Sequence, residues 1–113
     1  MKVYIAGKVS GEDTKECKEK FLQAEFALKR KGYEVVNPTK LVQSSTEWRQ
    51  AMIECIRHLV VCDAIYMLND WKASRGARLE HSIAQDLGLT IMYQNRADEY
   101  AERVSRSVST QSV

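Results

Sequence analysis

The sequence carries little excess charge of either sign. Its 17 basic and 15 acidic side chains leave a formal net charge of +2 over 113 residues. A protein that works by neutralising many phosphates of a nucleic acid carries a far larger basic excess. We therefore expect no DNA or RNA polymer as a partner, although a local basic cluster could still hold a single phosphate.

Long apolar runs and metal-type cysteine patterns are also missing. No uncharged apolar stretch is long enough to cross a membrane, and residues 1–6 enter a strand pattern without the apolar core of a signal peptide. The three cysteines, Cys17, Cys55 and Cys62, lack metal-ligand spacing and stand in apolar stretches. These absences predict a cytoplasmic protein without a membrane segment, with buried reduced thiols and with neither a metal nor a cofactor.

The residues that are present alternate between strand and helix patterns. Runs rich in β-formers cover about 2–6, 33–38, 63–68 and 89–93, and helical patterns cover about 14–31, 45–59 and 74–87. This alternation predicts an α/β fold, a small doubly wound parallel sheet of four or five strands with helices on both faces, flavodoxin-like or Rossmann-like. We expect one domain over 1–95, followed by a C-terminal helix and flexible tail over 96–113.

Local signals predict where these elements end and which side chains they bury. Gly32 is placed to end the first helix, Pro38 to end the second strand, and Ser45 or Thr46 to cap the second helix. The predicted buried face of the third helix consists of Leu79, Ile83 and Leu87. The two histidines expected at the surface or at caps are His58 and His81.

Ligands of parallel sheets bind outside the carboxyl ends of the strands. Function is therefore expected in the loops that follow the strands, at about 7–13, 37–45, 69–75 and 94–96. The third of these loops leads into a helix, so its backbone N–H groups and the helix dipole suit an anion.

The segment 71–80 combines several groups that suit a phosphorylated sugar. Lys72 and Arg75 add positive charge, and Gly76 lets a phosphate or a sugar approach the backbone. Glu80 stands four residues after that glycine, at the margin of the predicted apolar face, where burial raises the pKa of a carboxyl. The alternative is purely structural: Ser74 is a helix cap, Gly76 a packing glycine and Glu80 a solvated residue.

The first loop contains two glycines, Gly7 and Gly11, which enclose Lys8 and Ser10. Their order matches neither the dinucleotide-binding fingerprint nor a P-loop, so the loop is a weak signal by itself. Tyr4, in the strand before it, is either a core residue or a pocket residue. The same two alternatives hold for the tryptophans at 48 and 71, on which a base could stack.

Four segments together resemble the DUF4406 family. The matching residues run over about 1–94 and comprise Tyr4-Ile-Ala-Gly7 with Ser10-Gly11, Gly32-Tyr33 with Val35-Val-Asn-Pro38, Cys62-Asp-Ala-Ile-Tyr-Met-Leu68, and Trp71 with Ser74-Arg-Gly-Ala-Arg-Leu-Glu80. That family in turn resembles the nucleoside 2-deoxyribosyltransferases and the deoxynucleoside monophosphate N-glycosidases. The resemblance implies the same fold, a small nucleotide or nucleoside as substrate, and a homo-oligomer in which neighbouring subunits complete each pocket.

The resemblance also implies residue roles. Glu80 would attack the anomeric carbon of a 2-deoxyribose, and Ser74 and Gly76 would hold its 5′ group, while Tyr4 and the Gly7 to Gly11 loop would line the pocket. The enzymes carry an aspartate where this chain has Cys55, eight positions before Asp63. Possible substitutes for that aspartate are Asp63, Asn69 and Asp70. Three hypotheses remain open at this point: an N-glycosidic bond hydrolase or transferase, a non-catalytic nucleotide-binding module, and an interaction protein with a vestigial pocket.

Overall fold

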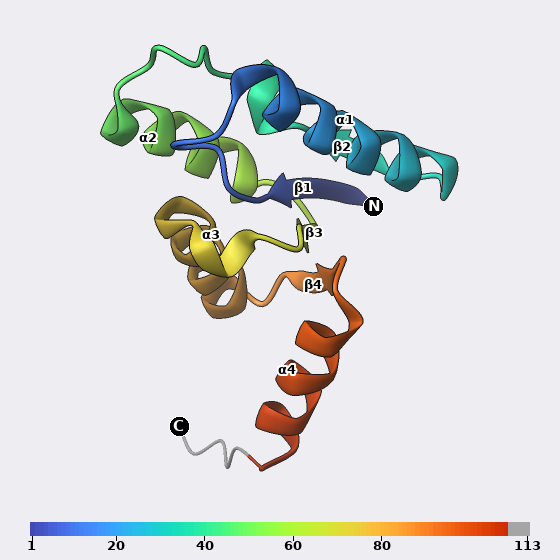
Figure 1. Cartoon of the computed structure of the whole chain (residues 1–113). Coiled ribbons are helices and arrows are strands. Elements are labelled where there is room, and N and C mark those ends of the chain that lie inside the picture. Colours follow the sequence, from blue (N-terminus) through green and yellow to red (C-terminus); the bar gives the residue numbers. More distant parts are fainter. Residues whose placement is uncertain (109–113) are drawn as a thin grey trace.

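The computed structural model describes the backbone of residues 1–108 and the side chains of residues 1–101, 103 and 104. Its strands are β1 (Lys2–Ala6), β2 (Glu34–Val36), β3 (Ala64–Met67) and β4 (Thr90–Tyr93). Its α-helices are α1 (Thr14–Arg30), α2 (Trp48–Leu59), α3 (Arg75–Leu87) and α4 (Arg96–Val108), and short 3-10 helices cover Pro38–Lys40 and Trp71–Ala73 (Figure 1). Within the described residues, no helix is long and apolar enough to span a bilayer.

The four strands form one parallel sheet in the order β2-β1-β3-β4. Val3 of β1 pairs with Val35 on one side and with Ala64 on the other, and Ile65 of β3 pairs with Ile91 of β4. This confirms the predicted doubly wound α/β fold, with four strands in the described part of the chain. The chain moves from β1 outward to β2 and then crosses back to β3, so the strand order reverses between β1 and β3.

Alternate residues of the central strands face opposite layers of the protein. Val3 and Ile5 pack with α1, where Phe21 is fully buried, whereas Tyr4 and Ala6 face the cluster that contains Leu59 of α2. Helices α2 and α3 therefore cover one face and α1 covers the other, while α4 extends away from the end of β4 (Figure 1). Burial on both faces explains the continuous apolar run of β3.

The structure corrects the predicted buried face of α3. Leu79 and Leu87 are 41% and 54% exposed, and Ile83 is only partly buried. The residues of α3 that are buried are Gly76, Ala77, Glu80, His81 and Ala84. These mostly small side chains let α3 approach its neighbours closely, which large leucines would prevent. The prediction that His81 lies at the surface or at a cap is also wrong, because its side chain belongs to this buried face of α3.

The ends of the elements agree with most of the local signals. Ser74 caps α3, and Gly88 ends it with a left-handed φ of +73°. Lys31 caps α1, and Gly32 follows it with a φ of +91°. The cap of α2 is Glu47, whose carboxylate accepts from the backbone N–H of Arg49, and not Ser45 or Thr46. Of the predicted flexible tail, residues 109–113 lie outside the described part of the chain, and α4 is helical as far as Val108.

Candidate active site

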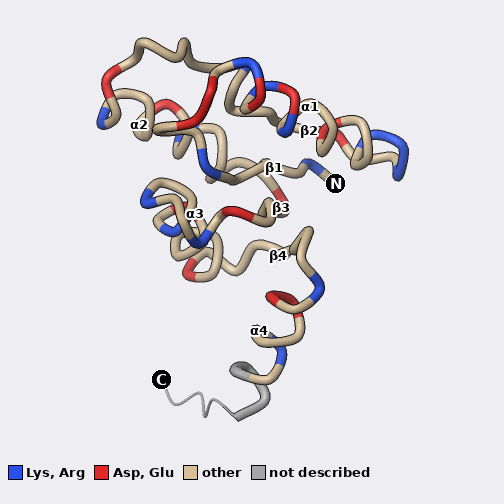
Figure 2. The backbone as a smooth tube through the Cα atoms, in the orientation of Figure 1, with Lys and Arg blue, Asp and Glu red and all other residues tan. Residues whose placement is uncertain are grey.

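A cavity of about 580 Å³ lies at the carboxyl ends of the strands, where the strand order reverses. Its walls come from the loop after β1, the segment after β2, helix α2 and the first turns of α3. Three of the four loops predicted to carry function, at about 7–13, 37–45 and 69–75, therefore contribute to its wall. The lining of the cavity includes both basic and acidic residues. Both signs also occur along α1 and α3 (Figure 2).

Glu80 is in the wall of this cavity and is nearly inaccessible to solvent, at 5% exposure. The hydroxyl of Tyr4 donates a short hydrogen bond to its Oε2, across 76 residues of sequence. Burial raises the pKa of Glu80 from 4.5 to about 7, and the Tyr4 hydrogen bond partly opposes that rise. The interpretation of Glu80 as a solvated helix residue is therefore wrong.

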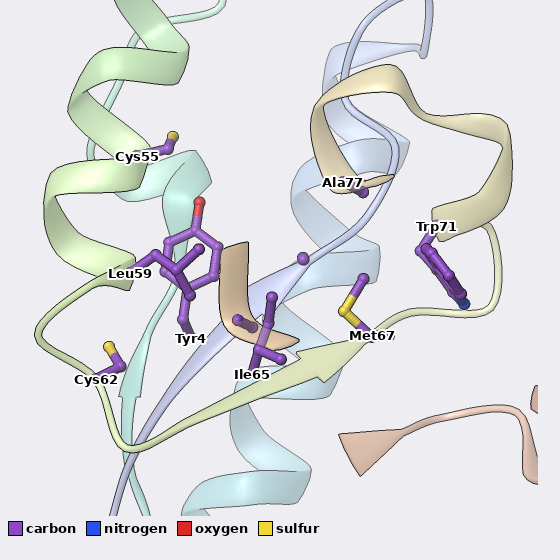
Figure 3. Close-up of a cluster of buried hydrophobic side chains, with 10 residues drawn as sticks. Tyr4, Cys55, Leu59, Cys62, Ile65, Met67, Trp71 and Ala77 are labelled. Carbon is purple, nitrogen blue, oxygen red and sulfur yellow. The ribbon is translucent and has the colours of Figure 1, made fainter. Parts of the chain in front are cut away.

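Tyr4 and Cys55 complete a small polar group around this carboxyl. Burial and the charge of Glu80 hold the pKa of Tyr4 well above its usual value. Burial likewise raises the pKa of the Cys55 thiol to about 11, against the effect of its hydrogen-bond contact with Tyr4. The Tyr4 hydroxyl points toward Cys55 in Figure 3, and both side chains line the cavity. At neutral pH the tyrosine and the thiol are both protonated, so neither is a nucleophile there.

The start of α3 has the structural role considered for it, and it also forms part of the cavity wall. Ser74 Oγ accepts from the backbone N–H of Ala77 at 3.1 Å, which is the capping role. A Cβ on Gly76 would lie 2.9 Å from Sδ of Met52, so the glycine permits close packing of α3 on α2. Ser74 and Gly76 also line the cavity, and so does Arg75, whose guanidinium lies over the ring of Trp48.

The loop after β1 is fixed to the end of β3 by charged groups. Asp70 accepts from the backbone N–H of Lys8 at 3.0 Å, and Lys20 bridges Asp70 at 2.5 Å and the carbonyl of Lys8 at 2.8 Å. A Cβ on Gly7 would lie 2.6 Å from Cδ1 of Leu68, so the close approach of loop and strand end requires a glycine there. The predicted site residues of this loop that line the cavity are Gly7, Lys8, Ser10 and Gly11.

Two of the predicted site residues do not line the cavity. Asn69 is exposed, and its backbone N–H donates to Gln94. Trp71 stacks on His81 with ring centroids 4.3 Å apart, and its Nε1 donates to Asp98 of α4. It lies well apart from Tyr4 and Cys55 in Figure 3 because its loop turns it toward β4 and α4.

The resembling enzymes carry an aspartate where this chain has Cys55. None of the residues considered as substitutes for that aspartate lines the cavity. Asn69 is accounted for above, Asp70 holds the loop, and Asp63 accepts from the backbone N–H of Lys2 at the other end of β3.

Sequence reasoning also missed part of the cavity wall. The additional lining residues include Glu12, Thr14 and Lys18 near the start of α1, Thr39 and Val42 after β2, and Ala51 and Met52 on α2. Most of them lie in or beside the loops that the topology marked, which is the one signal that could have identified them. Their side chains match no catalytic or binding motif.

The fold and the site define a small parallel α/β protein with an open cavity at its strand-order reversal and a buried carboxyl in the cavity wall. Residues 1–93 match the family described as Domain of unknown function (DUF4406), and the chain belongs to that family. The match ends with β4, so α4 lies outside it. A comparison with curated proteins returned no match.

Proposed function

We propose that this protein binds a nucleotide or nucleoside in the cavity and cleaves its N-glycosidic bond, with Glu80 as the nucleophile. The observation that carries the proposal is the environment of Glu80. It is buried in the wall of the cavity, and Tyr4 is its hydrogen-bond partner among the described residues, without a cation to offset its burial. Poorly solvated carboxyls in clefts are typical of catalytic sites.

In the proposed reaction, the ionised Glu80 carboxylate attacks C1′ of the 2-deoxyribose. A C–O bond to the sugar forms while the C1′–N bond breaks, and the base leaves with that electron pair and takes up a proton from solvent. Water then attacks C1′, loses a proton and releases the carboxylate, which gives hydrolysis, whereas a second base at this step gives transfer. Two displacements of this kind have lower barriers than direct loss of the base.

Other residues of the wall have supporting roles in this proposal. The Tyr4 hydroxyl orients the carboxylate and stabilises its charged form. Ser74 and Gly76, at the start of α3, hold the 5′ group of the sugar, where free backbone N–H groups favour an anion. The loop from Gly7 to Gly11 closes the opposite side. A cytoplasmic location and a homo-oligomeric state are part of the same proposal.

Mass spectrometry of a nucleotide panel tests the cleavage. We expect the protein to release free base from at least one deoxynucleoside or its 5′-monophosphate, and a pentosyl adduct to form on Glu80. Glu80→Gln should reduce the rate by about a thousandfold or more. Glu19→Gln, which removes an exposed carboxylate of α1, is the matched control and should keep the wild-type rate. No base release across the panel would overturn the proposal.

The second candidate function is a nucleotide-binding module without catalysis. Cys55 favours it, because its thiol is a weak acid at the position where the resembling enzymes carry an aspartate. This alternative predicts that nucleotides raise the melting temperature of the wild type and of Glu80→Gln alike, without any product.

A further inference from the structure

The side chains of Trp48 and Arg75 form a stacked pair in the cavity wall. Trp48 is the first residue of α2 and Arg75 the first of α3, and the guanidinium carbon lies 4.1 Å from the centroid of the indole ring. Both residues line the cavity, Arg75 is exposed, and Trp48 is partly buried. The guanidinium therefore covers one face of the indole ring. The side of the guanidinium that faces away from the ring is accessible.

Close packing of the two helices holds this pair in place. A Cβ at Gly76 would lie 2.9 Å from Met52 Sδ and 3.9 Å from Trp48 Nε1, so these two side chains of α2 pack directly against the backbone of α3. The indole ring is thus fixed against the backbone of α3, one residue from Arg75. A planar group held in one orientation loses little conformational entropy when a ligand stacks on it.

The two sides of the cavity differ in chemical character. The α2 side presents the Trp48–Arg75 pair with the apolar side chains of Ala51 and Met52, whereas the loop side presents the charged groups of Lys8 and Glu12 and the hydroxyls of Ser10 and Thr14. Tyr4 is the other aromatic ring in the wall, and its hydroxyl is occupied by Glu80. A ligand that matches this asymmetry has a flat heterocyclic end for the pair and a polar part that reaches the loop side and the backbone at Ser74.

We propose that the Trp48–Arg75 pair is the wall against which the base of the ligand stacks. The inference rests on the proposed function for its ligand class, but it requires only binding and not cleavage. Bases stack on indole rings and on guanidinium planes, and every base has a π-face, so such a wall accepts different bases. The pair therefore selects by stacking area, and purine nucleotides bind more tightly than pyrimidine nucleotides.

Fluorescence of Trp48 tests the stacking directly. Trp71→Phe leaves Trp48 as the only tryptophan, and Glu80→Gln in the same protein prevents turnover. We expect deoxyadenosine and deoxycytidine 5′-monophosphates to change the emission of Trp48, the purine at lower concentration. Ribose 5-phosphate, which lacks a base, should leave the emission unchanged.

Calorimetry on substituted proteins tests the contribution to affinity. Trp48→Leu should weaken binding of the purine nucleotide about tenfold or more, and Trp48→Phe, which keeps a ring, should restore most of it. Arg75→Lys, which keeps the charge but loses the plane, should reduce the preference for purine over pyrimidine. Should Trp48→Leu fail to fold, the fluorescence titration and Arg75→Lys still decide the matter.

The outcomes separate this inference from the proposed cleavage. Nucleotide binding that leaves Trp48 emission unchanged, or that Trp48→Leu does not weaken, overturns the stacking wall even where base release occurs. Base-dependent changes in Trp48 emission without base release from the wild type overturn the cleavage and support the wall. Equal affinity for purine and pyrimidine nucleotides overturns the proposal that the pair selects bases by their stacking area.

Discussion

Glu25 and Glu80 are buried to nearly the same extent, at 3% and 5% exposure, yet their pKa values are shifted in opposite directions. Around Glu25, hydrogen bonds from Lys29, Asn37 and Lys40 overcome the cost of burial and lower its pKa from 4.5 to about 2. For Glu80, burial outweighs the single hydrogen bond from Tyr4 and raises the pKa to about 7. The partners of each carboxyl, and not its depth, determine the direction of the shift.

The difference indicates which carboxyl is structural. Glu25 joins α1 to the segment after β2 through Asn37 and Lys40, both at 3.0 Å, and it also pairs with Lys29 of its own helix at 2.7 Å. Its charge is therefore compensated. Glu80 has no such compensation and faces a cavity. Burial of a carboxyl without a cationic partner costs free energy of folding, and this cost is the observation that supports the catalytic role proposed for Glu80.

The largest expected effect concerns the pH dependence of base release. If Glu80 acts as a carboxylate with a pKa of about 7, kcat/KM should rise about tenfold per pH unit below pH 7 and level off above it. Between pH 5 and pH 8 this amounts to about a hundredfold. Initial rates of base release over that range measure it. A flat profile, or one that falls as pH rises, would contradict the proposed role of the Glu80 carboxylate in catalysis.

Opposite effects on stability are expected when each carboxyl is replaced by an amide. The Glu25 contribution is present above about pH 4.5 and is lost as pH falls toward 2, so Glu25→Gln should lower the free energy of unfolding at pH 7 by up to about 3 kcal/mol. The destabilisation that Glu80 causes begins near pH 4.5 and is complete above pH 7. Glu80→Gln should therefore raise the free energy of unfolding by up to about 3 kcal/mol at pH 8.

Urea unfolding at several pH values measures both differences. At pH 4 the Glu80→Gln protein should match the wild type, because Glu80 is protonated in the folded protein there. Changes of the same sign in both variants at pH 8 would contradict the comparison.

The hydrogen bond from Tyr4 is expected to have a smaller effect. It stabilises the charged form of Glu80, so Tyr4→Phe should raise the pKa of that carboxyl further, by up to about one pH unit. The rising limb of the rate profile should move to higher pH by the same amount. Tyr66→Phe, on the opposite face of the sheet, is the matched control and should leave the limb in place.

The smallest effect is expected at the partners of Glu25. Lys40 is 58% exposed, and Lys29 remains beside the carboxylate when Lys40 is replaced. Lys40→Met should therefore lower the free energy of unfolding by less than about 1 kcal/mol at pH 7. In the Glu25→Gln background the same substitution should cost less still, because the charge with which Lys40 pairs is gone. A double-mutant cycle in urea measures the coupling. A coupling energy of zero would mean that Lys40 does not compensate Glu25.

The fold was largely predictable because its signals are local. Strand and helix patterns alternate, and the caps at Ser74 and Gly88 lie where the residue types place them. The buried face of α3 was not predictable, because small residues such as Ala77 and Ala84 give a weak periodic signal and the leucines of this helix face outward. The burial of a helix face depends on the shape of the neighbouring elements.

Only part of the candidate site could be predicted. Placing Glu80 beside Gly76 after a buried strand required only helical spacing and the rule for parallel sheets. The orientation of Trp71 toward α4 and of Trp48 toward the cavity required the packed structure, because a tryptophan in a loop or at a helix start carries no signal of direction.

The sequence by itself determined the order of the elements, the parallel sheet and the position of Glu80 along the chain, because these follow from local patterns and chain connectivity. The tertiary structure alone decided the state of that carboxyl. Its burial and its bond to Tyr4, 76 residues away, arise only when β1 and α3 pack together. The pKa of a buried group depends on every neighbour brought to it by the fold, and that information is not contained in any single segment.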